Sequence, residues 1–188
     1  MAWLLAIVVL VWARSSGKPW SALGLGPLPG VLTAAAALSA GALFKIVMKA
    51  VVMPLLGAPS VNQAYHYLAG NTLALAGIVL FVLVSGAFGE EVVLRGFVFE
   101  RVSALAGRSR DATAGAVAIS TAAFAAAHYA DQGWPGVEQA AFTGLAFALL
   151  FAWRRDLWTV MLVHAGFDLA AIAIIYENWE EPVSHLLR

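Results

Sequence analysis

Apolar residues in this chain gather in six long runs, and most of its polar and charged residues lie in the short stretches between them. The runs cover residues 2–13, about 31–56, about 71–99, 113–129, 137–153 and 157–176. Within them, apolar residues follow one another without the strict alternation that is typical of transmembrane strands. Lipid accepts only backbones whose hydrogen bonds are satisfied internally. The pattern therefore predicts an all-α fold, a polytopic transmembrane helix bundle with about six membrane spans.

The first run is shorter than the others. From Ala2 to Ala13 it has about a dozen residues, which as a helix would cover roughly 18 Å of a hydrocarbon core that is ~30 Å thick. We expect either a short interfacial helix or the end of a span that begins upstream. The run lacks a basic start and a small-residue cleavage site, so it is not typical of a signal peptide.

Composition also favours a membrane protein. Of the 188 residues, 62% are hydrophobic and 12% are charged, and that charged share is about half of what an ordinary soluble domain carries. No linker is visible, so we expect one membrane-embedded domain over residues 1–188. The 11 basic and 11 acidic residues cancel, and net charge gives no indication of nucleic-acid binding. The lack of cysteine excludes disulfide and thiolate chemistry.

Basic residues are concentrated in alternate loops. They follow the first, third and fifth runs and are Arg14, Lys18, Arg101, Arg108, Arg110, Arg154 and Arg155. The opposite loops are mostly neutral or acidic, so the basic loops are predicted to be cytoplasmic. Lys45 and Lys49 lie in the second run, on the side predicted to be external. We expect these two lysines to snorkel outward or to pair with an acidic group.

Two adjacent carboxylates and a guanidinium interrupt the third run, in the sequence EEVVLR at residues 90–95. Charges at membrane depth are unfavourable enough that they are usually functional. Glu91 and Arg95 are four positions apart with the acid first, the favourable order for an ion pair on one helix face. Glu90 has no such local partner, so we interpret it as the carboxylate that is free to act as a general base. The alternative is that all three charges only hold helices together.

Two further pairs of side chains share helix faces in later runs. Phe124 and His128 are four positions apart near the end of the fourth run, and His164 and Asp168 have the same spacing in the sixth. A histidine in the position of His128 is as often structural as functional. His164 and Asp168 lie in a run whose only other polar residue is Thr159, and two ionisable groups one turn apart there predict a site.

The order EExxxR, FxxxH and HxxxD, with each motif on its own apolar helix, resembles the CPBP family of membrane-embedded proteases. This family is named for CAAX proteases and bacteriocin-processing enzymes and is also called the Abi family. The matching residues are Glu90, Glu91, Arg95, Phe124, His128, His164 and Asp168. The stretch GEEVVLRGFVF at residues 89–99 is similar to the family's first motif region. The resemblance covers about residues 71–176, which we expect to contain the family's catalytic core.

The resemblance implies an intramembrane glutamic endopeptidase with a polar catalytic cavity inside the bundle and no cofactor. Glu90 would be the general base that activates water, with His128 assisting. His164 and Asp168 would face the negative charge that develops on the substrate. The other motif residues would give structural support; these are Glu91, Arg95 and Phe124.

The implied partners are membrane lipid and a peptide or protein substrate, with no nucleic acid. A membrane-associated or lipid-proximal peptide would be cut, such as a signal-like peptide, a bacteriocin leader or a membrane-anchored precursor. The composition is typical of a bacterial protein, so we expect a multi-pass protein of the bacterial cytoplasmic (inner) membrane. The sequence does not determine the oligomeric state.

One position departs from the family pattern, which often has asparagine where this chain has Asp168. An asparagine amide can donate a hydrogen bond to an oxyanion, whereas an ionised aspartate can only accept one. Asp168 would therefore be protonated through burial, or it would orient and charge His164, which then becomes the donor. We favour the second arrangement.

Three other interpretations use the same residues. A zinc-dependent metalloprotease could use Glu90, His128, His164 and Asp168 as nitrogen and oxygen ligands, but no HExxH spacing supports it and we expect a metal-free site. A non-enzymatic bacteriocin-immunity or maturation protein would need the polar cluster only for folding. A transporter could use it as a proton relay, although the chain has no inverted repeat.

The motif residues are predicted to lie at different depths. Glu90 precedes Arg101 by about eleven residues and falls near mid-membrane, whereas His128 falls near the external end of its run. For the two side chains to converge, helices must be staggered or tilted, or a deep water-filled cavity must reach Glu90.

Overall fold

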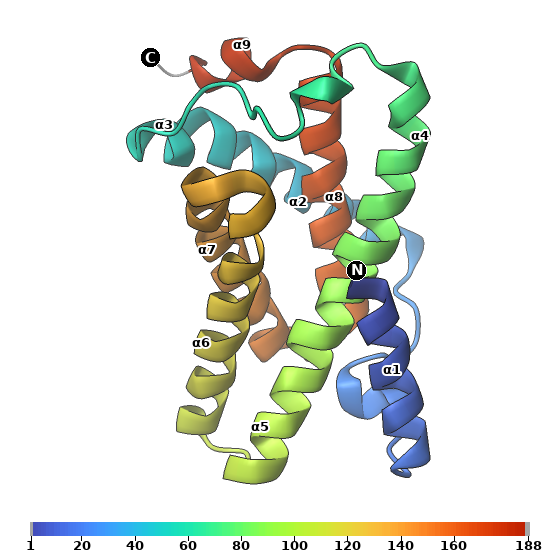
Figure 1. Ribbon diagram of the computed structural model, residues 1–188. Coiled ribbons are helices and arrows are strands. Elements are labelled where there is room, and N and C mark those ends of the chain that lie inside the picture. The colour runs from blue at the N-terminus through green and yellow to red at the C-terminus, as the bar shows by residue number, and fades with distance from the viewer. Residues whose placement is uncertain (1, 187–188) are drawn as a thin grey trace.

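The computed structural model describes residues 2–186, and helices make up most of this part of the chain (Figure 1). The first elements are α1 (Ala2–Ser15), the 3-10 turn η1 (Trp20–Leu23), α2 (Val31–Val47), the π-helical η2 (Met48–Val52) and α3 (Met53–Leu55). A 3-10 turn, η3 (His66–Leu68), interrupts the connection that follows. No strand occurs within residues 2–186, so the predicted all-α fold class is confirmed.

The second half of the chain begins with one long helix over residues 72–106. It consists of α4 (Thr72–Phe81), the π-helical η4 (Val82–Glu90) and η5 (Val92–Phe97), and α5 (Val98–Ala106). The remaining helices are α6 (Arg110–Ala127), α7 (Tyr129–Arg154), α8 (Leu157–Tyr176) and the short α9 (Glu180–Ser184).

The prediction of about six membrane spans is not confirmed. Within residues 2–186, four helices are long and apolar enough to cross a membrane, namely Val31–Leu55, Thr72–Ala106, Tyr129–Arg154 and Leu157–Tyr176. The apolar helix α1 has only 14 residues, and α6 is rich in alanine and begins with Arg110 and Asp111. Small side chains and a charged first turn keep the hydropathy of α6 below that of the four candidate spans.

Helices α2 and α8 pack backbone against backbone because each contributes a glycine to their contact. A Cβ placed on Gly41 would lie 1.8 Å from the carbonyl oxygen of Val163, and one on Gly166 would lie 2.0 Å from that of Leu38. Small residues at helix contacts permit this close approach in membrane proteins. The contact fixes the position of α8, whose middle turns carry His164 and Asp168.

The two ends of the bundle differ in charge. The connection between α5 and α6, which contains Arg108, lies at one end, and α3 and α9 lie at the other (Figure 1). Helix α1 ends beside Arg14 at the same end as the α5–α6 connection (Figure 1). The arginine-rich loops predicted from the sequence thus gather at one end of the molecule, opposite the segment of residues 57–71 and α9.

Candidate active site

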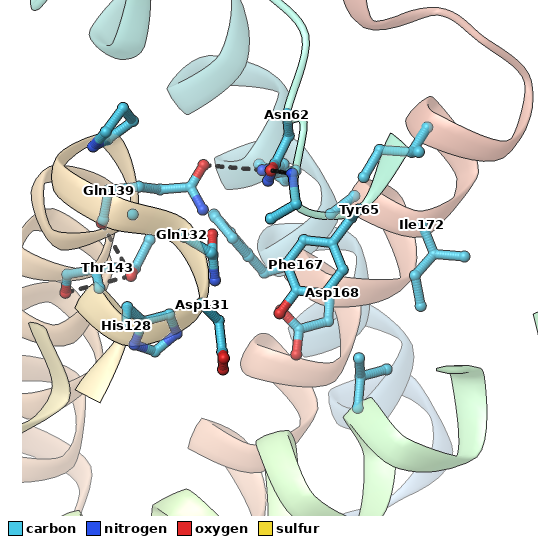
Figure 2. A pocket seen from close by; sticks show the side chains of 18 of the residues that line it. Asn62, Tyr65, His128, Asp131, Gln132, Gln139, Thr143, Phe167, Asp168 and Ile172 are labelled. Carbon is cyan, nitrogen blue, oxygen red and sulfur yellow. Dashed lines mark hydrogen bonds between the residues drawn. The ribbon is translucent and has the colours of Figure 1, made fainter. Parts of the chain in front are cut away.

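A cavity of about 590 Å³ lies between the long 72–106 helix, α7 and α8, and the 57–71 segment borders it. Four side chains predicted to be catalytic line this one cavity: Glu90, His128, His164 and Asp168. Their convergence results from the short α6, whose junction with α7 lies inside the height of the bundle and below α3 in Figure 1. His128 at this junction therefore faces the space that α8 borders with Asp168 (Figure 2).

The ion pair predicted between Glu91 and Arg95 is present and completely buried. Arg95 Nη1 donates to Glu91 Oε1 at 2.9 Å, and both side chains have no solvent exposure. Arg95 Nη2 donates to the carbonyl oxygen of Gly144 on α7 at 3.0 Å. The guanidinium thus connects the long 72–106 helix with α7 and also neutralises a carboxylate inside the bundle.

His164 contacts a carboxylate on each side of its ring. Its Nδ1 lies 2.7 Å from Glu91 Oε1, within hydrogen-bond distance. Its Nε2 lies 3.4 Å from Asp168 Oδ2, which is an ion-pair distance, but no hydrogen bond joins these two atoms. Since a carboxylate accepts hydrogen bonds, Nδ1 donates to Glu91. When the ring is doubly protonated, Nε2 also carries a hydrogen, and this hydrogen remains available to a ligand.

The sequence did not predict that Glu91 holds His164. The interpretation from i, i+4 spacing gave Asp168 the role of orienting this histidine and gave Glu91 only Arg95 as a partner. Glu91 and His164 are 73 positions apart on different helices, and no spacing rule connects residues so distant. Glu91 therefore lies at the centre of a buried hydrogen-bond network, in which its Oε1 accepts from both Arg95 and His164.

The aromatic ring of Phe124 packs between the charged groups. It is 3% exposed, and its ring lies 4.7 Å from Arg95 Cζ, 4.6 Å from the His128 ring and 5.8 Å from the His164 ring. A guanidinium over an aromatic face is attracted to its electrons. Gly144 leaves room for this ring, because a Cβ there would lie 2.9 Å from Phe124. The structural role predicted for Phe124 stays a prediction.

Glu90 differs from Glu91 in its surroundings. It lines the cavity at the end of the π-helical η4 and is half-buried. None of the hydrogen bonds or ion pairs within residues 2–186 includes its carboxylate, whereas Glu91 accepts two. Glu90 is thus the carboxylate whose oxygens are available to a ligand or water in the cavity.

His128 has a defined tautomer. Its Nδ1 lies 2.8 Å from the carbonyl oxygen of Phe124, and because a carbonyl only accepts, this nitrogen carries the proton. The neutral ring then has an unprotonated Nε2, which can accept a hydrogen bond or a proton. The carbonyl oxygen that fixes the ring thus belongs to the last turns of α6, which ends just before His128.

The π-helical turns bring the backbone of the long helix close to α8. A Cβ on Gly86, which lies one turn before Glu90, would be 3.1 Å from Asp168 Oδ2 and 3.9 Å from His164 Nε2. π-helical bulges occur frequently at functional sites. The glycine therefore makes room for the carboxylate and imidazole beside Glu90.

Several polar residues of the cavity were not predicted from the sequence. Gln139 and Thr143 of α7 and Tyr65 of the 57–71 segment border the same space as Asp168 (Figure 2). Burial raises the pKa of the Tyr65 phenol above its usual value, and the charge of Asp131 adds to the increase, so this hydroxyl stays neutral. None of these residues lies in a charged motif, so the sequence contains no signal for them.

Glu180 anchors the 57–71 segment, which borders the cavity. It is 2% exposed and accepts a hydrogen bond from the backbone nitrogen of Asn62 at 2.7 Å. Lys49 Nζ lies 3.4 Å from Glu180 and also donates to the carbonyl oxygen of Ser60, and His66 Nδ1 lies 3.2 Å away. Of the two alternatives predicted for these lysines, pairing with an acidic group holds for Lys49, whereas no described carboxylate forms an ion pair with Lys45.

The same side chains do not form a preformed metal site in the part of the chain that the structure describes. Within residues 2–186, no group of three or more His, Cys, Asp or Glu side chains is arranged so that it could hold a metal ion. Both ring nitrogens of His164 face carboxylate oxygens instead of a shared point with His128. The predicted zinc alternative with Glu90, His128, His164 and Asp168 thus has no preformed ligand geometry here.

Comparison with known proteins gives one match. A family model described as type II CAAX prenyl endopeptidase Rce1-like matches residues 72–170, which is more than half of the 188-residue chain. Neither a curated protein nor a solved structure matches. The matched range begins with α4 and includes all seven motif residues.

Proposed function

The chain belongs to the Rce1-like family of type II CAAX prenyl endopeptidases, and on this premise we propose that it is an intramembrane endopeptidase whose catalytic water is activated by Glu90. The family is a protease family, and with four apolar helices the chain is a multi-pass integral membrane protein. The observation that supports the role of Glu90 is its position: it lines the cavity, and no described side chain or backbone group occupies its oxygens.

Glu90 and His128 together can hold the nucleophilic water. The carboxylate of Glu90 and the unprotonated Nε2 of His128 are both acceptors in the same cavity. A water that donates one hydrogen bond to each would direct its lone pair toward a peptide carbonyl carbon. Glu90 would then take the proton as the water attacks, the ordinary task of a general base.

His164 is proposed as the donor to the oxyanion. Its Nδ1 is committed to Glu91, and its Nε2 makes no hydrogen bond within the described chain. Two carboxylates, Glu91 and Asp168, flank the ring and favour the doubly protonated form, which can donate from Nε2 to the developing negative charge. Collapse of the tetrahedral intermediate then passes the proton from Glu90 to the leaving amine.

Asp168→Asn tests the proposed part played by Asp168. If the carboxylate charges His164, the amide should lower kcat by about 100-fold, the size of effect seen when one oxyanion contact is lost. The variant should lose little thermal stability, because the carboxylate that it replaces is partly exposed and its ion pair with His164 is long, at 3.4 Å. Retained activity would instead favour a neutral donor at position 168.

The proposed substrate is a membrane-associated peptide. A cavity of about 590 Å³ is of the size that takes a drug-sized ligand or a short peptide segment. Its lining includes Phe81 of α4, a ring that is 51% exposed on the surface of an apolar helix. A peptide anchored in lipid could therefore enter from the side of α4, with membrane lipid as a neighbour; a bacterial inner-membrane location agrees with this arrangement.

The cavity is proposed to open on the side of the membrane opposite the cytoplasm. Exposed residues of its lining, Gln63 and Asp131 among them, lie toward the 57–71 segment and α9. The arginine-rich loops lie at the other end of the bundle and are predicted to face the cytoplasm. A substrate on the external side would reach Glu90 without crossing the arginine-rich end.

A zinc enzyme is the alternative mechanism. Zinc removal would then abolish activity, whereas the glutamate mechanism is insensitive to it. Elemental analysis of purified protein and its activity after chelator treatment separate the two. Stoichiometric zinc with chelator-sensitive activity would replace the proposal.

A non-enzymatic immunity or maturation protein is the alternative of another class. Glu90→Gln decides between this class and an enzyme, because it preserves shape and removes only the base. The processing of membrane peptides should be lost while the variant protein remains inserted and folded. A variant that processes peptides like the wild type would end the protease proposal.

A further inference from the structure

Residues 59–66 cover the cavity at the end of the bundle where α9 lies, and we call them the lid. The lid belongs to the connection that crosses from α3 to α4 (Figure 1), and its Tyr65 borders the same space as Asp168 (Figure 2). A glycine with positive φ lies on either side of it, Gly57 at 75° and Gly70 at 64°. The lid is therefore a short irregular stretch between two points at which the backbone can turn.

The lid is attached to the rest of the protein through one carboxylate. The backbone nitrogen of Asn62 donates to Glu180 Oε1 at 2.7 Å, and His66 Nδ1 lies 3.2 Å from Glu180 Oε2. The carbonyl oxygen of Ser60 accepts from Lys49 Nζ, which itself lies 3.4 Å from Glu180 Oε1. Within residues 2–186, every hydrogen bond from the lid to the chain outside the 57–71 segment thus involves Glu180 or its partner Lys49.

Glu180 reaches the lid because the chain reverses directly after α8. Asn178 has a φ of 58°, in the left-handed region that asparagine adopts more readily than most residues. The backbone nitrogen of Trp179 donates to the carbonyl oxygen of Ile174 at 2.8 Å, which closes the helix end. After this reversal Glu180 is 2% exposed and lies beside Lys49 of η2. A buried carboxylate needs a charged partner and hydrogen bonds, and the lid supplies part of them.

Apolar packing does little to hold the lid in place. None of residues 59–66 is buried, whereas Leu68, just beyond the lid, is 1% exposed. Segments with few buried apolar contacts open at a low free energy compared with the rest of a fold. The polar contacts at Glu180 therefore decide whether the lid lies over the cavity.

We propose that the lid opens and closes the cavity and that Glu180 is the latch that keeps it closed. When Asn62 and His66 leave the carboxylate, Lys49 stays paired with it, so the buried negative charge remains compensated in the open state. Lids of this kind exclude water from a cavity and control entry to it. The inference goes beyond the proposed peptidase function and does not depend on it.

Cysteine reactivity beneath the lid tests this proposal. The chain has no cysteine, so Thr143→Cys supplies a single thiol in the cavity wall, at a position that is 3% exposed. The purified full chain in nanodiscs is treated with a water-soluble trimethylammonium methanethiosulfonate, and mass spectrometry follows the rate of modification. The thiol should react slowly while the latch is intact.

Glu180→Gln in the Thr143→Cys background should speed this modification at least about tenfold. The change keeps the shape of the side chain and removes the charge that strengthens the hydrogen bonds from the lid. The matched control is Glu181→Gln at the neighbouring carboxylate, which is exposed and makes no hydrogen bond or ion pair in the described chain. This control should stay within about twofold of its parent. Equal rates for the two glutamine variants would overturn the proposal.

A second reporter separates lid opening from a general loosening of the bundle. Ser120→Cys lies in α6, completely buried and outside the cavity lining, and Glu180→Gln should leave its rate unchanged. Equal acceleration at both reporters would overturn the latch.

His66→Ala decides the matter if Glu180→Gln fails to fold. It removes one contact of the latch from the side of the lid, and the replaced side chain is 42% exposed, so the protein should fold. Modification of Thr143→Cys should become about two- to fivefold faster, the range expected for a partly exposed contact. An unchanged rate in folded His66→Ala protein would overturn the proposal.

The outcome is independent of the peptidase proposal, because modification of a cysteine requires no hydrolysis. Unchanged rates would remove the lid and leave the proposed peptidase standing. A fully active Glu90→Gln enzyme would refute the proposed role of Glu90 and leave the lid standing.

Discussion

Glu91→Gln and Glu90→Gln are isosteric changes at adjacent positions, and we expect the first to lower stability strongly and the second to leave it nearly unchanged. Glu91 is completely buried, and its Oε1 accepts from Arg95 at 2.9 Å and from His164 at 2.7 Å. Glutamine keeps an acceptor but removes the negative charge between two basic groups. Glu90 makes no hydrogen bond or ion pair within residues 2–186, so the same change there removes no contact of the folded chain.

The expected loss of stability in Glu91→Gln follows from the charge that stays buried without its partner. Breaking a buried ion pair by removing one partner destabilises a fold by about 3–5 kcal/mol, because the other charge is left uncompensated. In Glu91→Gln that charge is Arg95, whose guanidinium has no solvent exposure. A chain of this length loses roughly 2–4 °C in melting temperature for each kcal/mol. We expect Glu91→Gln to melt roughly 6–20 °C below the wild type and Glu90→Gln within about 2 °C of it.

Thermal unfolding of the purified variants in one detergent and at one scan rate measures this difference. The scan rate is fixed because unfolding of such a protein is commonly irreversible. Adding Arg95→Met to Glu91→Gln should recover part of the loss, since the uncompensated cation is removed. Equal melting temperatures for Glu91→Gln and Glu90→Gln would refute the division of the two carboxylates into a structural and a free one.

Two further predictions concern the site and its orientation. Gly86→Ala should lower kcat several-fold with little change in stability, because the new Cβ would lie 3.1 Å from Asp168 Oδ2 and displace it by less than about 1 Å; a full shift of about 1 Å at an active site can reduce the rate by about 100-fold. Gly77→Ala is the matched control, because its Cβ meets open space. Equal kinetics for the two variants would contradict the close approach of Gly86 to Asp168. The chain has no cysteine, so single-cysteine variants label cleanly: a membrane-impermeant maleimide should react in intact cells with Gln63→Cys and, only after permeabilisation, with Ala106→Cys at the end of α5. The reverse labelling would place the cavity mouth on the cytoplasmic side.

Helix α8 was predicted residue for residue because both of its ends carry local signals. The side chain of Asp156 accepts from the backbone nitrogen of Trp158 as a cap, and the apolar run ends at Tyr176. The start of α7 was predicted too late, at residue 137 instead of Tyr129. Gly133 and Pro135 are typical of a loop, yet here they form a kink, with φ of 61° at the glycine, inside a helix that continues.

The candidate site was predicted as a set of side chains but not as a geometry. The pair of Glu91 and Arg95 followed from i, i+4 spacing, and it forms although the surrounding turns are π-helical. An apolar run contains no signal that distinguishes π from α turns, so this feature could not be predicted. The contact of Glu91 with His164 depends on how two helices pack, which local spacing does not encode.

Quantitative mass spectrometry of membrane peptides from cells that express wild-type protein or Glu90→Gln tests the central claim most directly. Loss of a general base lowers the rate of a reaction by about 100- to 10,000-fold. At equal amounts of inserted protein, we expect at least one membrane precursor to be shortened with the wild type and to remain intact with the variant. Identical peptide profiles in the two strains would contradict the role of Glu90 as the general base.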